Sequence, residues 1–267
     1  MRGAEDVARR SGYSLILANS DESPDKERQY IHTLLSRQID GLLVAPASNA
    51  SRPLLELLSR HKKPFVLIDR VVDGVHADVV VSDNIGGARI LTEHLIGLGH
   101  HRIGLINGLP WVSTARERRC GYMEALRIHG IEARPELVVE GNLKREGGAR
   151  AARQLLALPP DQRPTAIFAD TIFHAVGAIE CLRGACLSIP EDIALVCFDD
   201  IELLSALQPF LTTVSQPAHM FGTIGMQILL ERLNGGEAQP LRKIVLPLEL
   251  TVRISCGARA YLAPRAT

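Results

Sequence analysis

The sequence has no excess of either charge. Its 30 Lys and Arg residues balance 30 Asp and Glu residues, so the formal net charge is zero. A chain that grips nucleic acid through its phosphates usually carries a basic excess or a basic stripe. The composition of these 267 residues therefore gives no support to direct DNA binding.

Long apolar runs are also lacking, and no stretch is long enough for a helix that spans a membrane. The first residues, MRGAED, are charged, and no long apolar segment follows them. This is not the pattern of a secretory leader. We therefore expect a cytoplasmic protein with no membrane partner.

Cysteines are few and odd in number, five in all. An odd count, with Cys197 inside an apolar strand pattern, fits reduced thiols better than a disulfide framework. Cys181 and Cys186 follow His174 on one predicted helix, which leaves a zinc site as a minor alternative. Because no second ligand pair follows, we predict no metal site, and nothing in the sequence indicates a cofactor.

What the chain does contain is a regular alternation of apolar runs and helical patterns. The runs are continuous, as expected of parallel strands that helices cover on both faces. This alternation predicts an α/β fold with parallel sheets. Predicted strands are Ser14–Ala18, Gly41–Ala45, Phe65–Ile68, Val79–Ser82, Arg102–Asn107, Thr165–Ala169 and Ile193–Phe198. Predicted helices are 4–10, 24–37, 52–61, 84–98, 115–129, 145–157, 172–183 and 217–233.

Short carboxylates and amides follow most of these strands. They are Asn19, Asp21, Asp69, Asp83, Asn84, Asn107, Asp170, Asp199 and Asp200. Ligands of open parallel sheets bind beyond the carboxyl ends of the strands, and such side chains pair well with sugar hydroxyls. The alternative is that they cap the next helix, which we prefer for Asp83 and Asp200. For Asp170 and Asp199 both interpretations stay open.

The segment STARERRCGYMEALRIHGI (113–131) predicts an amphipathic helix. Arg118, Tyr122 and Ala125 share one face of it, so Arg118 lies on or beside the buried face. An arginine in such a place needs an anionic or hydroxyl-rich partner. The only tryptophan, Trp111, follows a strand end closely. It either stacks on a sugar ring or covers a loop.

The sequence contains no complete catalytic motif. Ser59 and Lys62 match Ser-x-x-Lys and residues 82–84 read SDN, but the third element of that β-lactamase set is absent, so we treat both matches as chance. The stretch GLGHHRIG (97–104) lies between a helix and a strand. This is the reverse of the order that phosphate binding at a helix N-terminus requires. We therefore do not expect an enzyme.

Several longer motifs together carry a resemblance. SDNIGGARILTEHLIGLGHHRIGLING followed by RERRCGYMEAL is similar to the effector-binding domain of the LacI/GalR family of bacterial transcriptional regulators. LSIPEDIALVCFDDIEL, PFLTTVSQP and LELTVRIS extend the similarity in order, from Gly3 to about Gly257. Two of these motifs, LTTVSQP and IPEDIALVCFDD, also separate the chain from periplasmic sugar-binding proteins that share the fold.

The resemblance implies two flavodoxin-like lobes of the periplasmic-binding-protein type, with an effector in the cleft between them. It places residues 1–99 and 215–240 in the N-terminal lobe, 100–214 and 241–257 in the C-terminal lobe, and 258–267 in a tail. Crossings near 99–101, 208–216 and 235–242 are the expected hinges.

The effector site that the resemblance implies includes Arg118 and Asp199, with Thr114 and Gln216 as wall residues. Asp170, Trp111 and Asn19 complete the predicted set. One position departs from the family pattern. Thr171 and Ile172 stand where many members have an Asn-Asp pair, and Ile172 offers no hydrogen bond to a sugar hydroxyl.

Intact family members begin with a helix-turn-helix DNA-binding domain. RGAEDVARRSGYSL resembles the second half of the first helix of the effector domain. By this resemblance the chain lacks the helix-turn-helix domain, the hinge and the first strand of the N-terminal lobe. We then expect it to reach operator DNA only through the helix-turn-helix domain of an intact chain.

The predicted function is sensing of a small, polar, sugar-like effector that modulates operator binding by a homodimeric repressor. A stand-alone solute-binding protein is the alternative, and an enzyme that acts on a sugar is the third possibility.

Overall fold

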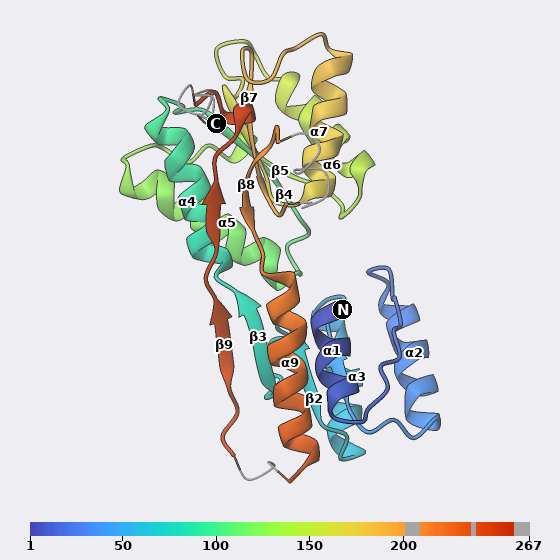
Figure 1. Ribbon diagram of the computed structural model, residues 1–267. Coiled ribbons are helices and arrows are strands. Elements are labelled where there is room, and N and C mark those ends of the chain that lie inside the picture. Colours follow the sequence, from blue (N-terminus) through green and yellow to red (C-terminus); the bar gives the residue numbers. More distant parts are fainter. Residues whose placement is uncertain (201–208, 236–238, 259–267) are drawn as a thin grey trace. The chain divides into compact units, whose positions relative to one another are not determined.

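The computed structural model describes residues 1–200, 209–235 and 239–258 (Figure 1). Their contacts divide the chain into two compact units. Unit 1 comprises 1–82, 111–114 and 217–247, and unit 2 comprises the remaining residues.

This division corrects the expected lobe boundaries. Helix α4 (Asn84–Gly97) belongs to unit 2, although residues up to 99 were expected in the first lobe. The reason is its buried face, because Ala88, Leu91 and Leu95 join the core around the second sheet. Residues 241–247 join unit 1, since their strand pairs with the first sheet.

Unit 1 is built on a four-stranded parallel sheet in the order β1-β2-β3-β9. The strands are β1 (Leu42–Val44), β2 (Phe65–Ile68), β3 (Asp78–Ser82) and β9 (Lys243–Leu246). The helices are α1 (Arg2–Arg10), α2 (Pro24–Ser36), α3 (Arg52–Arg60) and α9 (Ala218–Leu233). Helices α1 and α9 share one apolar cluster with Val66 and Val80, while α2 and α3 share another with Leu67 and Val79.

The predicted strand Ser14–Ala18 is wrong. The segment belongs to no strand, and Ile16 and Leu17 are 62% and 67% exposed. Its apolar run has the composition of a strand, but a strand forms only against a neighbour. Among the described residues no other strand pairs with it.

Unit 2 holds a six-stranded sheet in the order β10-β8-β7-β6-β4-β5. All neighbours are parallel except β10 and β8. The strands are β4 (Ile103–Asn107), β5 (Val138–Glu140), β6 (Ala166–Ala169), β7 (Ala194–Phe198), β8 (Thr212–Ser215) and β10 (Glu249–Thr251). Its other helices are α5 (Ser113–Ile128, whose first two residues group with unit 1), α6 (Arg145–Leu156) and α7 (Ile172–Gly184).

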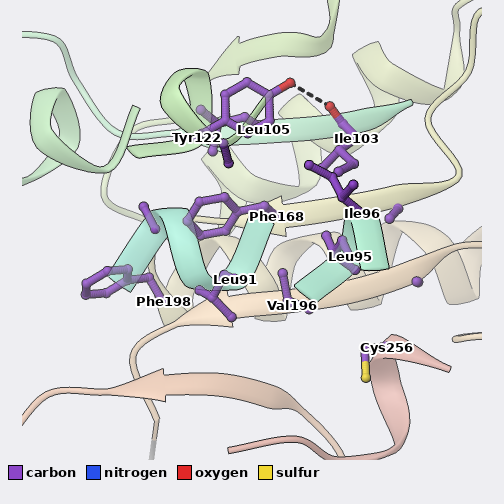
Figure 2. Packing of buried hydrophobic residues seen from close by; sticks show 14 of the residues in the cluster. Leu91, Leu95, Ile96, Ile103, Leu105, Tyr122, Phe168, Val196, Phe198 and Cys256 are labelled. Carbon is purple, nitrogen blue, oxygen red and sulfur yellow. Dashed lines mark hydrogen bonds between the residues drawn. The ribbon is translucent and has the colours of Figure 1, made fainter. Parts of the chain in front are cut away.

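The core of unit 2 has one layer on each face of the sheet. Figure 2 shows one layer, where Leu91 and Leu95 of α4 and Tyr122 of α5 lie near Phe168 of β6. The hydroxyl of the buried Tyr122 donates to the carbonyl of Ile103 at 2.8 Å. The other layer joins α6 and α7 to the sheet. The buried face predicted for Tyr122 and Ala125 is confirmed.

Two kinds of predicted helix signal, capping carboxylates at helix starts and glycines just beyond helix ends, are confirmed at most positions. The Asp83 carboxylate caps α4 by accepting from Gly86 N at 2.9 Å, as expected. Gly99, Gly130 and Gly235 have positive φ just beyond helices. At Gly184 the expectation is wrong, because α7 includes it and the positive φ falls on Cys186. The cap expected at Asp200 depends on 201–208, which lie outside the described residues.

Candidate functional site

Four neighbouring strands of unit 2 end in polar side chains. Asn107 ends β4, and Asp170, Asp199 and Gln216 each follow the last residue of β6, β7 and β8. These strands are parallel and adjacent in the order β8-β7-β6-β4, so their carboxyl ends share one edge of the sheet. We call these four side chains, with Arg118, the polar edge. Such an edge is where ligands of open parallel sheets bind.

Arg118 enters the polar edge from the second turn of α5. Only 3% of it is exposed. Its Nε donates to Asn84 Oδ1 at 3.0 Å, and its Nη1 donates to the Asp170 carbonyl at 2.5 Å. The guanidinium carbon lies 3.7 Å from the centre of the Phe198 ring, a cation–π contact that fixes the plane of the group. The guanidinium is therefore held from three sides before any ligand is present.

Asp199 faces this guanidinium. Its Oδ2 lies 3.8 Å from Arg118 Nη1, and its Oδ1 accepts a hydrogen bond from Gln216 Nε2. The Asp199 side chain is 26% exposed, while that of Arg118 is 4% exposed. The guanidinium and the carboxylate thus converge on one place, with the carboxylate on the more open side. Their separation is longer than a direct hydrogen bond.

Asp170 faces inward. Only 1% of the residue is exposed. Its Oδ1 lies 2.6 Å from His174 Nδ1, and its Oδ2 accepts from Gly108 N at 2.5 Å. When the Asn107 amide is turned to satisfy both of its atoms, its nitrogen donates to the same Oδ2 at 3.3 Å. Both carboxylate oxygens are therefore occupied by protein groups.

His174 is hydrogen-bonded to this carboxylate in a fully buried position. Its other ring nitrogen, Nε2, faces the carbonyl of Asn142, so both ring nitrogens point at oxygen acceptors. Burial alone lowers the pKa of His174, but the hydrogen bond and the charge of Asp170 outweigh burial and raise it. The arrangement favours a protonated imidazole beside an ionised Asp170. It also explains why His174, considered above as a metal ligand, has no free nitrogen.

The glycine at position 141 allows the imidazole to pack here. A Cβ on Gly141 would lie 2.3 Å from His174 Nε2, which no real contact permits. The absence of a side chain at Gly141 therefore makes room for the buried imidazole.

The structure brings together four of the seven predicted site residues: Arg118, Asp170, Asp199 and Gln216. The other three belong to unit 1. Thr114 is buried in the first turn of α5, and Trp111 is 52% exposed in the loop before that helix. Asn19 is exposed, and its Oδ1 accepts from Asp21 N at 3.0 Å in a local turn.

Sequence reasoning missed three members of the cluster around Arg118. Asn84 was considered only as one of the polar side chains that follow strands and as a helix start, and Phe198 only as part of a core strand. His174 was considered only as a metal ligand. The spacing of Asp170 and His174 is a usable signal, because residues four apart at a helix start can touch. No comparable signal marks Phe198, whose ring reads as ordinary core.

Two other kinds of site have no candidate among the described residues. In that part of the chain no three His, Cys, Asp or Glu side chains gather in a way that could hold a metal ion. None of the described helices is both long and apolar enough to cross a membrane.

Comparison with known proteins gives a consistent result. Residues 92–256 match the family model described as "Periplasmic binding protein-like domain". The HTH-type transcriptional repressor PurR of Aliivibrio fischeri (strain ATCC 700601 / ES114) is 33% identical over 235 residues, which are 88% of this chain and 69% of that protein. The ribose operon repressor of Escherichia coli K12 is 32% identical over 249 residues, 93% of this chain and 74% of that protein.

Solved structures agree. The transcriptional regulator CelR in complex with cellobiose superposes with a TM-score of 0.85 at 32% identity, over 95% of this chain and 76% of that one. A LacI family regulator from Enterococcus faecium with bound ribose gives 0.82 at 27% identity, over 95% and 92%. Both relatives found by sequence are named as repressors. The chain belongs to the LacI/GalR family of transcriptional regulators and corresponds to its effector-binding, periplasmic-binding-protein-like part.

Proposed function

We propose that unit 2 senses a small, polar, sugar-like effector at the polar edge. The observation that carries the proposal is the approach of Arg118 Nη1 to Asp199 Oδ2 at 3.8 Å, beyond the carboxyl ends of parallel strands. In the described part of the chain, Nε and Nη1 of Arg118 donate hydrogen bonds and Nη2 has no hydrogen-bond partner. A ligand hydroxyl can accept from the guanidinium and donate to the carboxylate.

The chemistry of the edge favours a hydroxyl-rich ligand over a simple anion. An anion would gain from Arg118 but would meet the negative charge of Asp199. A sugar presents donors and acceptors on adjacent carbons and can satisfy both groups at once. The bound cellobiose and ribose in the two related regulators support this choice of ligand class.

The polar contacts concentrate at Arg118 and Asp199. Ile172 offers no hydrogen bond, and the Asp170 carboxylate is occupied by His174 and Gly108. We therefore revise the expected role of Asp170. It positions Arg118 through its carbonyl and is not expected to touch the effector.

The regulatory step follows from population shift. An effector changes the balance between two arrangements of a regulator by no more than its difference in affinity for them. We propose that this change alters operator binding in a homodimer whose chains carry the helix-turn-helix domain. Sedimentation equilibrium tests the dimer, and a monomer at all concentrations would contradict it.

Isothermal titration calorimetry with a panel of pentoses, hexoses, disaccharides and nucleosides tests the ligand, with Trp111 fluorescence as a second signal. We expect one sugar class to bind, and Arg118→Lys and Asp199→Asn each to weaken it at least about tenfold, the equivalent of ~1.4 kcal/mol. Arg119→Lys, on the exposed side of the same helix, is the matched control and should leave affinity unchanged. Equal losses in all three variants would overturn the assignment, as would a folded protein that binds no member of the panel.

A further inference from the structure

The strands of unit 1 are parallel, so their starts lie at one end of the unit (Figure 1). Helices α2, α3 and α9 each lead into the start of a strand of this sheet, and they therefore end at the same end. Helix α1 also ends there, because Arg10 lies with Leu230 and Glu231 of α9 along one surface groove. Side chains at these helix ends and strand starts thus share one end of unit 1.

This end of unit 1 carries many Lys and Arg side chains. They stand at the ends of α1, α2 and α3 and at the starts of β2 and β9. We call the following set the basic end: Arg9, Arg10, Arg37, Arg60, Lys62, Lys63, Arg242 and Lys243. All are exposed or half-buried. Arg242 Nη1 lies 2.7 Å from Glu231 Oε2, whereas within the described chain the other seven form no ion pair. The basic end is therefore a cluster of like charges and not a network of ion pairs.

Few acidic side chains offset these charges. Among the described residues at this end, Asp40 is exposed, Asp78 is buried in its fork with Arg232, and Glu231 pairs with Arg242. The first turns of α1 and α2, at the opposite end of the unit, carry acids instead. The net charge of zero for the whole chain therefore hides a separation of charge along unit 1.

Helix dipoles explain only part of this pattern. Cations are favoured at a helix C-terminus, but the effect fades beyond the last turn. It accounts for Arg10 and Arg60, which lie in last turns. Lys62 and Lys63 follow the end of α3, and Lys243 lies in β9, so the dipoles do not account for them. These additional charges favour an anionic partner.

We propose that the basic end contacts the phosphate backbone of double-stranded DNA without reading its sequence. Four strands about 4.8 Å apart make this end about 15 Å wide, and a helix layer on each face makes it at least about 20 Å deep. A duplex carries one charge per about 1.7 Å, so one lying along the strand starts presents about nine phosphates. Lys and Arg at helix ends and loops can contact phosphates, whereas reading bases requires an element that enters a groove. The contact adds sequence-independent affinity to operator binding by chains that carry the helix-turn-helix domain.

A duplex suits the basic end better than other polyanions. Single strands bind where bases stack on exposed aromatic rings. The described aromatic side chains at this end, Tyr13 and Phe65, instead pack in the apolar clusters of unit 1. Acidic peptides and anionic lipid surfaces share the negative charge but lack the rigid, regular spacing of the phosphates. The experiment separates these partners.

The experiment uses the full chain and a fluorescently labelled duplex of about 20 base pairs, with binding measured by fluorescence anisotropy. We expect a Kd of about 10⁻⁵ M or below at about 50 mM salt, and a steep loss of affinity by about 200 mM. Contacts to four or five phosphates correspond to a slope of about −4 for log K against log salt. A duplex of unrelated sequence should bind within about twofold. A single strand of equal length, polyglutamate and anionic lipid vesicles should each bind at least about tenfold more weakly at equal charge.

A triple variant removes charge from the basic end. Arg60→Gln, Lys62→Gln and Lys63→Gln lie at or beyond the end of α3, and all three side chains are exposed or half-buried. Circular dichroism should therefore show folded protein. We expect at least about tenfold weaker binding of the duplex and a salt slope that is smaller by about two to three, since each phosphate contact contributes about one.

A second triple variant is the matched control. Arg127→Gln, Arg153→Gln and Arg183→Gln remove three exposed charges from unit 2, each from the last turn of a helix. The two variants have the same net charge, so general attraction to DNA falls equally in both. We expect the control to stay within about twofold of the wild-type affinity.

Effector binding at the polar edge should be unchanged in both variants, which separates this proposal from the proposed function of unit 2. Several results would overturn the proposal: equal losses in the two variants, an affinity that does not change with salt, or no binding of the duplex by folded protein. Equal or tighter binding of the single strand, the peptide or the vesicles would also overturn it.

Discussion

Among the described residues each unit buries one arginine, and the two are held in different ways. In unit 1, Arg232 meets Asp78 as a fork, with Nε to Oδ2 at 2.7 Å and Nη2 to Oδ1 at 3.0 Å. The carbonyls of Gln239 and Pro240 accept further hydrogen bonds from it. In unit 2, Arg118 donates to one amide oxygen and one backbone carbonyl. Its carboxylate partner, Asp199, lies farther away, with Oδ2 3.8 Å from Arg118 Nη1.

The difference separates a structural arginine from a candidate binding arginine. Arg232 ties α9 to β3 through a pair that has little left to offer a ligand. Arg118 is buried to a similar degree, yet its carboxylate partner stands apart and is partly exposed. Burial alone therefore says little about function, and the geometry of the partner decides.

The largest expected effect tests the structural pair. Asp78→Asn leaves the Arg232 charge buried without its partner, and we expect it to lower the free energy of unfolding by about 3–5 kcal/mol. The measurement is urea denaturation. Glu56→Gln is the matched control, because it breaks the exposed pair with Arg52 and should cost about 0.5 kcal/mol or less. Similar small losses in both variants would show that the Asp78 pair is not a structural anchor.

A smaller effect tests the support behind Arg118. Gly141→Ala places a Cβ at 2.3 Å from the buried His174 ring, and we expect a loss of about 1–3 kcal/mol in unfolding free energy. Effector affinity should fall with it, since His174 holds Asp170 and Asp170 holds Arg118. Gly97→Ala, at an open position at the end of α4, is the control and should be neutral or slightly stabilising. A Gly141→Ala protein as stable as the control would contradict the role of His174.

The smallest expected effect is on how the free energy of unfolding changes with pH. The change has opposite signs for Asp78 and for His174. The pKa of Asp78 is lowered, because hydrogen bonds from Arg232 and from Arg242 N outweigh its burial. Its stabilisation is present above the ordinary Asp pKa and is lost as pH falls through the lowered value. The pKa of His174 is raised, so its stabilisation is present below the ordinary His pKa and is lost as pH rises through the raised value.

Unfolding measured across pH therefore distinguishes the two clusters. The difference between wild type and Asp78→Asn should shrink in acid. The difference between wild type and His174→Asn should shrink in alkali. The same slope for both variants would contradict this assignment of charges.

Much of the fold was predictable from the sequence. Continuous apolar runs located β2, β4, β6 and β7 within a residue or so, because these strands are central and buried on both faces. The short strands β5, β8, β9 and β10 were missed. Strands β5, β9 and β10 are only partly buried, and β8 is buried but reads TTVS, which is not a continuous apolar run. The strand predicted at 14–18 does not form, because local composition does not reveal whether a neighbouring strand exists.

The candidate site was predictable in its charged members only. Arg118 stood out because helical periodicity placed a charge on a buried face, and Asp199 because it follows an apolar strand. The contacts that orient them come from distant parts of the chain. Asn84 begins another helix, and the Phe198 ring is a core residue that also supports the guanidinium. No spacing along the sequence encodes such contacts.

Asp69 and Asp199 occupy matching turns in the two units. Each directly follows a strand, has positive φ (66° and 90°), and donates its N–H at 2.9 Å to a carbonyl of the adjoining parallel strand. Because the same bend occurs once in each unit, it is a property of the fold and does not depend on a bound ligand. The Asp199 backbone is thus fixed before any ligand binds. An effector at the proposed site would therefore not have to offset the entropy cost of ordering it.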